Sequence, residues 1–434
     1  MKRIMSFLWE ETRIAWLIPM LTLGVILSSC GVAEVEGIDS LDVADDIFDV
    51  FIISDIMKEN EDVYFEVIQP GLASEPRSAI LEIHPDLTTC VPSYITIHDE
   101  QFCISLTELE LFGWLLTNED IKSLSHMVNL TRLTITESED MAMLFAYPRL
   151  TDLTPLANLT NLTFLNLGGN GINDISPLAY LTNLTVLNLN GNLITDLTPL
   201  TELINLTELR LQANPVNDIT PLSGLLNLNT LTLCGYLNAT YFSIEPLTNL
   251  INLTYLGISS RQISDLTPLS GLSNLQTLSM DFNQINDLTP LTGLRNLLTL
   301  HAYGNEIKDL TPLTNLVNIT TLHLYVNQIR DITPLASLIN LRDLHLDDNA
   351  INDLTPLSNI TTLEFLSAGA NQISDLTPLS GLTNLMELHL FVNQINDLTP
   401  LLKLDNLWYL SLFGNPITDW SAVAHIEQVR GRPR

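Results

Sequence analysis

Histidine is the side chain whose spacing in this sequence first suggests chemistry. Four of the eight histidines are separated by 22 residues or a multiple of 22: His301, His323, His345 and His389. Three imidazoles on neighbouring strands, together with Asp343 or Asp347, would be geometrically possible as zinc ligands. The same column also arises when one repeat unit is duplicated, and no pattern of supporting residues is legible around it. We therefore predict no metal site and no cofactor.

Other catalytic and nucleic-acid-binding patterns are missing from the sequence. No serine or cysteine nucleophile has a legible base partner, and no glycine-rich phosphate loop occurs. The formal net charge of -32, from 50 acidic and 18 basic residues, would repel a polyanion. We predict a protein that is not an enzyme and does not bind nucleic acid.

One hexapeptide returns along most of the chain, as TDLTPL, NDISPL and NDITPL. Its prolines run from Pro155 to Pro400, with ten intervals of 22 residues and one of 25. A period in the twenties that persists over so many copies is typical of a solenoid, in which each unit packs only against its neighbours. The histidine column is thus one column of a repeat.

Within a unit, the segment LxLxxN fits a short strand with leucines on its buried side. The asparagine that follows the strand can bond backbone groups of the turn, so we assign it a structural role. Threonine or serine before the proline predicts the N-cap of a short helical turn, and the preceding aspartate is expected to cap the turn or bond backbone donors.

The unit, seen cleanly in LTNLTFLNLGGNGINDISPLAY from Leu159 to Tyr180, resembles the 22-residue leucine-rich repeats of bacterial internalins. The resemblance covers residues 105 to 434. It implies an α/β repeat solenoid: a right-handed leucine-rich repeat superhelix with a concave parallel β-sheet and short 3₁₀ turns on the convex side. It also implies that the concave face binds a protein, often through exposed aromatic side chains.

Because the leucines, asparagine, aspartate and proline build the coil, contacts with a partner are expected at the outward strand positions. We expect an exposed aromatic patch that suits protein binding; the alternative is that the rings only pack on one another after duplication of units. The predicted partner contacts are His301, Tyr303, His323, Tyr325, His345, Asp347, His389, Phe391, Tyr409 and Phe413. Binding of carbohydrate or cell wall on the same face is the alternative, and a cytosolic interaction scaffold is another.

The first thirty residues carry the pattern of an export signal. Lys2, Arg3 and Arg13 are followed by about 14 apolar residues, which is shorter than the ~20 of a membrane-spanning helix and within the range of about 7 to 15 for a secretory signal. The ending LSSC resembles the lipobox of bacterial lipoproteins, which implies lipidation of Cys30 and an outward-facing anchor in the bacterial membrane. An ordinary cleaved signal and an uncleaved anchor are the alternatives.

These patterns divide the chain into five segments: a lipoprotein signal peptide (1–29), a partly ordered acidic tether (30–75), a small β-rich cap (76–105), the repeat array (106–414) and a C-terminal cap (415–434). In the β-rich cap, YITI and QFCI are the expected strands. Cys90 and Cys103 flank this hairpin-like stretch, and a disulfide between them is possible. We expect a monomer that binds a protein ligand.

Overall fold

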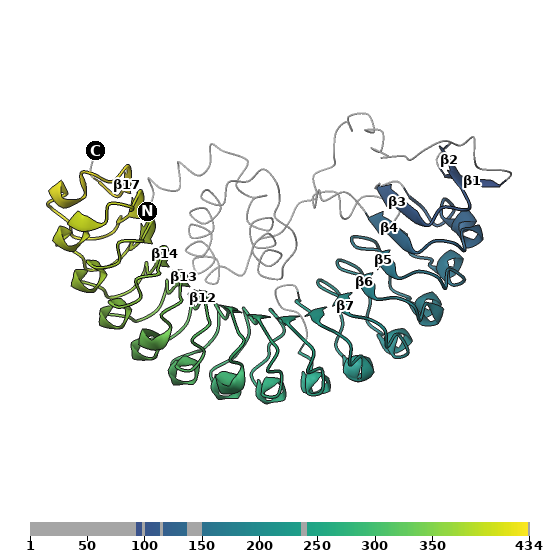
Figure 1. Ribbon diagram of the computed structural model, residues 1–434, viewed down its shortest axis with the longest axis horizontal. Helices are drawn as coiled ribbons and strands as arrows, with labels where there is room; N and C mark the ends of the chain where they lie inside the picture. The colour runs from purple at the N-terminus through teal and green to yellow at the C-terminus, as the bar shows by residue number, and fades with distance from the viewer. Residues whose placement is uncertain (1–92, 98–99, 113–115, 137–149, 236–240, 433–434) are drawn as a thin grey trace, which may run out of the picture.

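The computed structural model describes residues 93–97, 100–112, 116–136, 150–235 and 241–432. The predicted signal peptide, Cys30, the acidic tether and Cys90 lie outside the described residues. The described chain forms a two-stranded antiparallel hairpin and one parallel sheet of 15 strands, each beside its neighbour in the sequence. The strands line the inner side of an arc and short helical turns lie on its outer side (Figure 1). This arrangement confirms the predicted leucine-rich repeat solenoid.

The strands of the parallel sheet are short, most of them three residues long. They are β3 (Glu108–Phe112), β4 (Arg132–Thr136), β5 (Phe164–Asn166), β6 (Val186–Asn188), β7 (Glu208–Arg210), β8 (Thr230–Thr232), β9 (Tyr255–Gly257), β10 (Thr277–Ser279), β11 (Thr299–His301), β12 (Thr321–His323), β13 (Asp343–His345), β14 (Phe365–Ser367), β15 (Glu387–His389), β16 (Tyr409–Ser411) and β17 (Gln428–Arg430).

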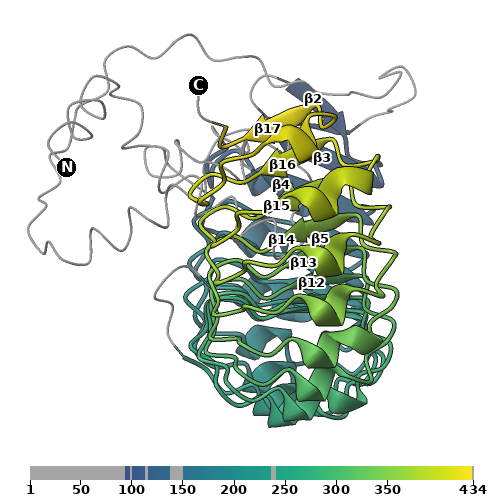
Figure 2. The ribbon, with the colours of Figure 1, turned by 90° about the vertical axis from the view of Figure 1, so that its left-hand side faces the viewer.

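A 3₁₀ helix follows most strands on the convex side. These helices are η2 (Lys122–His126), η4 (Thr154–Leu156), η5 (Ser176–Tyr180), η6 (Thr198–Leu200), η7 (Thr220–Gly224), η8 (Glu245–Leu247), η9 (Thr267–Leu269), η10 (Thr289–Gly293), η11 (Thr311–Leu313), η12 (Thr333–Ser337), η13 (Thr355–Leu357), η14 (Thr377–Leu379), η15 (Thr399–Lys403) and η16 (Ser421–Val423). Strands and turns stack in separate columns, as Figure 2 shows.

The core is a stack of leucine layers. In the parallel register Leu300 pairs with Leu322, which pairs with Leu344, and all three side chains are fully buried. The residues before and after each of these leucines point to the concave face, as the period of two in a strand requires. Duplicated units therefore place equivalent side chains next to each other.

The asparagine column has the structural role predicted for it. Asn192 Nδ2 donates to the carbonyl oxygens of Leu167 and Leu189, both at 2.9 Å, and its Oδ1 accepts the backbone N–H of Ile172 at 3.1 Å. The side chain is buried. It therefore satisfies polar backbone groups that have left the strand ladder and are hidden from water.

The convex turns are capped by aspartate and not by threonine. Thr198 is the first residue of η6, and its backbone N–H donates to Asp196 Oδ1 at 2.8 Å. The predicted N-cap role of the threonine is therefore wrong, because the carboxylate two residues earlier already accepts the free donor at the start of the turn. The predicted capping role of the aspartate is confirmed.

Two successive units in the middle of the array lack the asparagine, and the arginine of the second compensates. Arg261 stands in the asparagine position of that second unit and is fully buried. Its guanidinium reaches back to the carbonyl oxygens of Leu233 (2.6 Å), Val216 (3.1 Å) and Asn214 (3.2 Å). Strands β8 and β9 consequently keep the parallel register of the rest of the sheet.

The two ends of the array differ from its middle. At the first end, β1 (Tyr94–Ile97) and β2 (Glu100–Cys103) form the predicted hairpin. At the other end, the predicted cap adds β17, which extends the sheet by one strand beyond those marked by paired leucines.

Cys103 is disulfide-bonded, but its pairing with Cys90 stays a prediction because Cys90 is not described. Among the described residues, no helix is long and apolar enough to span a membrane.

Candidate functional site

The histidine column predicted from the sequence forms on the concave face. His301, His323 and His345 are direct neighbours in the parallel register of β11, β12 and β13. The rings of His301 and His323 stack with their centroids 4.4 Å apart, and those of His323 and His345 meet edge to face at 4.2 Å. All three side chains are half-buried.

The column continues through rings from the strand position before the leucine. Phe365 stacks on His345 at 4.6 Å and contacts His389 at 5.2 Å, and His389 stacks on Tyr409 at 4.9 Å. We call the six side chains His301, His323, His345, Phe365, His389 and Tyr409 the ring ladder; it crosses β11 to β16. Phe365 was missed because it occupies a different position in its repeat from the histidines, although Tyr409 occupies that position two units later.

Two shorter stacks lie beside the ring ladder. Tyr303 stacks on Tyr325 at 4.1 Å and meets Phe282 edge to face at 5.0 Å. Phe391 stacks on Phe413 at 5.1 Å. The aromatic residues of the later repeats are thus brought together, as the sequence indicated, and Phe282 joins them without having been predicted.

The prediction of an exposed patch is wrong for part of this set. Tyr303, Asp347, His389, Phe391 and Tyr409 are buried. One physical reason is that neighbouring strands lie about 4.8 Å apart, so stacked rings cover each other's faces. Tyr325 and the first three histidines are half-buried, and Phe413 is 42% exposed.

Asp347 is engaged within the sheet. Its Oδ1 accepts the Ser367 hydroxyl at 2.5 Å and the backbone N–H of Gly369 at 2.7 Å. Asp281 has the corresponding role three units earlier, where its Oδ1 accepts the backbone N–H of Tyr303 at 3.1 Å. This position therefore joins adjacent strands, and Asp347 is a structural residue of the face.

Asp343 is the charged group at the centre of the face. It lies 3.4 Å from His323 Nε2 through Oδ2 and 3.1 Å from His345 Nε2 through Oδ1. Burial alone would raise the pKa of Asp343, but hydrogen bonds and charge from the two histidines hold it well below its usual range. Burial and the charge of His345 lower the pKa of His323, against the opposing effect of Asp343.

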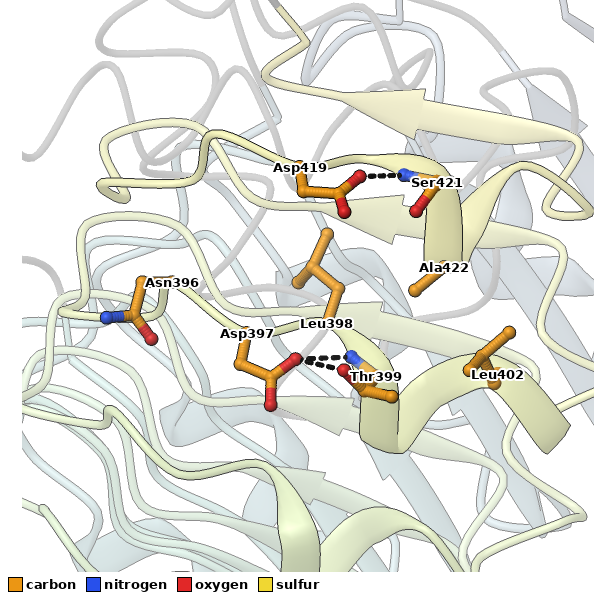
Figure 3. A pocket seen from close by; sticks show the side chains of 8 residues that line it. All are labelled: Asn396, Asp397, Leu398, Thr399, Leu402, Asp419, Ser421 and Ala422. Carbon is orange, nitrogen blue, oxygen red and sulfur yellow. Dashed lines mark hydrogen bonds between the residues drawn. The ribbon is translucent and has the colours of Figure 1, made fainter.

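Hollows on the convex side involve groups that already have partners. One is lined by residues of the last two turns, including Asp397, Thr399, Asp419 and Ser421. In Figure 3 each carboxylate points to the start of a turn, where Asp397 accepts the N–H of Thr399 and Asp419 that of Ser421, both at 2.9 Å. The chemistry of this hollow is therefore that of helix capping, and the concave face is the better candidate site.

Comparisons with known proteins agree with this architecture. A family profile described as Leucine Rich repeats (2 copies) matches residues 160–202, 251–293, 295–337 and 317–359. The crystal structure of an internalin (inlF) from Listeria monocytogenes is 34% identical, with a TM-score of 0.65, over 74% of this chain and 90% of that one. Comparison with curated proteins gives no match.

More distant solved structures share the fold alone. A leucine-rich repeat protein from Leptospira interrogans is 23% identical with a TM-score of 0.56, over 75% of this chain and 93% of that one. The ectodomain of a plant membrane receptor kinase from Arabidopsis thaliana is 17% identical, also with a TM-score of 0.56, over 76% of this chain and 47% of that one.

Proposed function

The chain belongs to the internalin family of leucine-rich repeat proteins, and from this we propose that it is a non-enzymatic cell-surface lipoprotein whose concave face binds a protein partner. The observation that carries the proposal is the ring ladder on six adjacent strands, with the Tyr303–Tyr325 and Phe391–Phe413 stacks beside it. The phenylalanine rings supply apolar area, and the tyrosine and imidazole rings add polar atoms at their edges, which suits a protein surface.

Stacking also prepares this face for binding. A ring held between two neighbours has already lost much of its rotational freedom, so less side-chain entropy is lost when a partner arrives. His323, for example, has His301 on one side and His345 on the other. A rigid face of this kind favours a folded partner surface or an extended peptide laid along the sheet.

The ring geometry favours protein over carbohydrate. Sugars commonly bind by laying their apolar side against the open face of an aromatic ring, whereas the rings of the ladder and of the two shorter stacks use their faces for each other. Tyr303 and Tyr325 are inclined by only 11° at 4.1 Å, and Phe391 and Phe413 by 6° at 5.1 Å. The tyrosine hydroxyls and imidazole nitrogens at the ring edges can still donate hydrogen bonds to a protein and accept them from it.

Partner capture tests the binding role. Immobilised wild type is compared with a Tyr325→Ala/Phe413→Ala variant, both positions being accessible on the concave face. The control is Tyr180→Ala, an aromatic that is 70% exposed in η5 on the convex side. We expect partners that wild type and control both recover and the double variant loses. Equal recovery by all three, or binding only to a glycan array, would contradict the proposal.

The lipid anchor is tested separately, through Cys30. We expect metabolic incorporation of a fatty-acid analogue into wild type and none into Cys30→Ala, with both proteins quantified by immunoblot. Equal labelling of the two proteins would contradict the lipid anchor at Cys30 and would not affect the proposal for the binding face. An intact N-terminal mass in native protein would instead favour a cytosolic scaffold.

A further inference from the structure

Asp343 bridges two histidines from adjacent strands of the concave sheet. His323 ends β12, whereas Asp343 and His345 are the first and last residues of β13. The carboxylate is 3.4 Å from one Nε2 and 3.1 Å from the other, and one ligand atom from each of the three residues lies within 4.8 Å of the others. Two imidazole nitrogens and a carboxylate thus lie close together, with each nitrogen nearest a different oxygen of Asp343.

These separations match the geometry of a tetrahedral metal site. With metal–ligand distances of about 2.0 to 2.1 Å, two ligands of a tetrahedron lie about 3.3 Å apart. The two nitrogen–oxygen separations, one to each oxygen of the Asp343 carboxylate, bracket that value. We propose that His323, Asp343 and His345 form a binding site for a divalent transition metal ion, Zn²⁺ being the ion that fits this ligand set, with the fourth position open.

The rings on either side hold the two histidines in place. His301 stacks on the far face of His323 with an angle of 6°, and Phe365 stacks on His345 at 4.6 Å with an angle of 21°. Orientation of an imidazole by its surroundings is what tunes a metal ligand in known sites. Here packing between rings supplies that orientation, so the duplicated units around the site have a role in it.

The site is open to solution, and its donors select the class of ion. The side chains of His323, Asp343 and His345 are 21%, 37% and 24% exposed. Imidazole nitrogen suits zinc, copper or nickel, whereas calcium and magnesium require mostly oxygen ligands. The large negative charge of the chain also raises the local concentration of cations. The open position faces the concave side, where water or a donor from another molecule can occupy it.

Titration of the full chain with Zn²⁺ alone, by calorimetry in excess Mg²⁺, tests the site. We expect one Zn²⁺ per chain, with affinity at least tenfold lower in His345→Gln and Asp343→Asn. The matched control is His389→Gln, from the same column, whose Nε2 lies 3.8 Å from Glu387; among the described residues, no second imidazole pairs with that carboxylate. The control should bind as wild type does. Absence of saturable binding, or equal affinity in all variants, would overturn the proposal.

A second measurement does not depend on whether the variants fold. Side-chain NMR of the wild type should show Zn²⁺-induced shifts at Nε2 of His323 and His345 and none at the exposed His126 and His425. Shifts at the exposed histidines alone would assign the ion to unspecific surface groups. Because both measurements use no partner, they can fail while the proposed protein-binding function stands, and the reverse also holds.

Discussion

Arg261 Nε donates a hydrogen bond of 2.6 Å to the carbonyl oxygen of Leu233, in a repeat unit that has no asparagine of its own. The guanidinium also bonds the carbonyl oxygens of Val216 and Asn214, and lies 5.0 Å from the ring centroid of Phe242. Burial lowers the pKa of Arg261 to about 10, so the side chain remains charged near neutral pH. A buried cation is costly in a protein interior, and several backbone acceptors offset that cost here.

Replacing Arg261 with methionine should therefore destabilise the middle of the array. Methionine retains much of the apolar stem but leaves the carbonyl groups of Leu233, Val216 and Asn214 without this donor. Buried unsatisfied groups cost about 1–3 kcal/mol each, so we expect a loss of about 3 kcal/mol in the free energy of unfolding. Urea unfolding followed by circular dichroism measures it. The control is Arg330→Met, on an exposed side chain, and an equal loss in both variants would contradict the structural role of Arg261.

Substitution in the buried asparagine column should cost far more stability than substitution of an exposed asparagine such as Asn183. Asn192→Ala removes two donated hydrogen bonds and one accepted bond from buried backbone groups, so we expect a loss of about 3 kcal/mol. Asn183→Ala removes one 2.8 Å bond to the Thr160 carbonyl at an exposed position, and its cost should be below about 1 kcal/mol. Similar unfolding midpoints for the two variants would argue against a core role of the first column.

Asp281 should make stability fall as pH rises. Burial raises the pKa of Asp281 to about 7, against hydrogen bonds from Ser279 and from the backbone N–H of Tyr303. Between about pH 4 and 7 the folded protein keeps this proton and the unfolded chain has released it. The raised pKa of Asp281 therefore stabilises the folded state most below about pH 4. This stabilisation is lost as pH rises from about 4 through the folded pKa of about 7, and the free energy of unfolding falls by at most about 1.4 kcal/mol per pH unit.

Asp281→Asn isolates this contribution, because the amide has the same shape and does not titrate. The unfolding free energy of the wild type should fall relative to that of Asp281→Asn as pH rises from 4 to 7. Asp265→Asn serves as the opposite control, since hydrogen bonds from Thr267 lower the pKa of Asp265, whose contribution is therefore lost as pH falls. If wild type and Asp281→Asn changed in parallel with pH, the buried-proton account would fail.

Much of the fold was predictable because the repeat fixes backbone positions. A constant period places Leu300, Leu322 and Leu344 in one layer, and the same period puts His301, His323 and His345 side by side. The terminal hairpin followed from alternation in YITI and QFCI. These inferences needed only strand geometry, which depends on spacing and not on side-chain rotamers.

The rest depends on how side chains turn, which spacing does not fix. Sequence placed Tyr303 and Phe391 on the concave face but could not show that stacking hides them. Nor could it show that Arg261 reaches back 28 residues to Leu233. Nor does spacing show that Asp343 lies between two imidazoles. One of them, His345, comes from the same strand as Asp343, and the other, His323, comes from the neighbouring strand β12.

Phe365 connects two halves of the ring ladder, since it stacks on His345 and also contacts His389. Phe365→Ala should open a gap at β14 that frees both histidines to adopt other rotamers. We expect recovery of the captured partner to fall at least tenfold, because hot-spot truncations commonly cost about 2 kcal/mol or more.

Phe164→Ala is the matched control for this change. Phe164 is the first residue of β5, just as Phe365 is the first residue of β14, and its ring carries Arg132 at 3.9 Å in place of stacked rings. Both variants lose the same side chain from the same position of a repeat, so they should lose similar amounts of packing energy. Quantitative mass spectrometry of captured proteins then separates binding from folding. A partner retained by Phe365→Ala as well as by Phe164→Ala would mean that the continuous ladder is a packing feature, and that contacts must be sought on the half-buried Tyr325 and the exposed Phe413 alone.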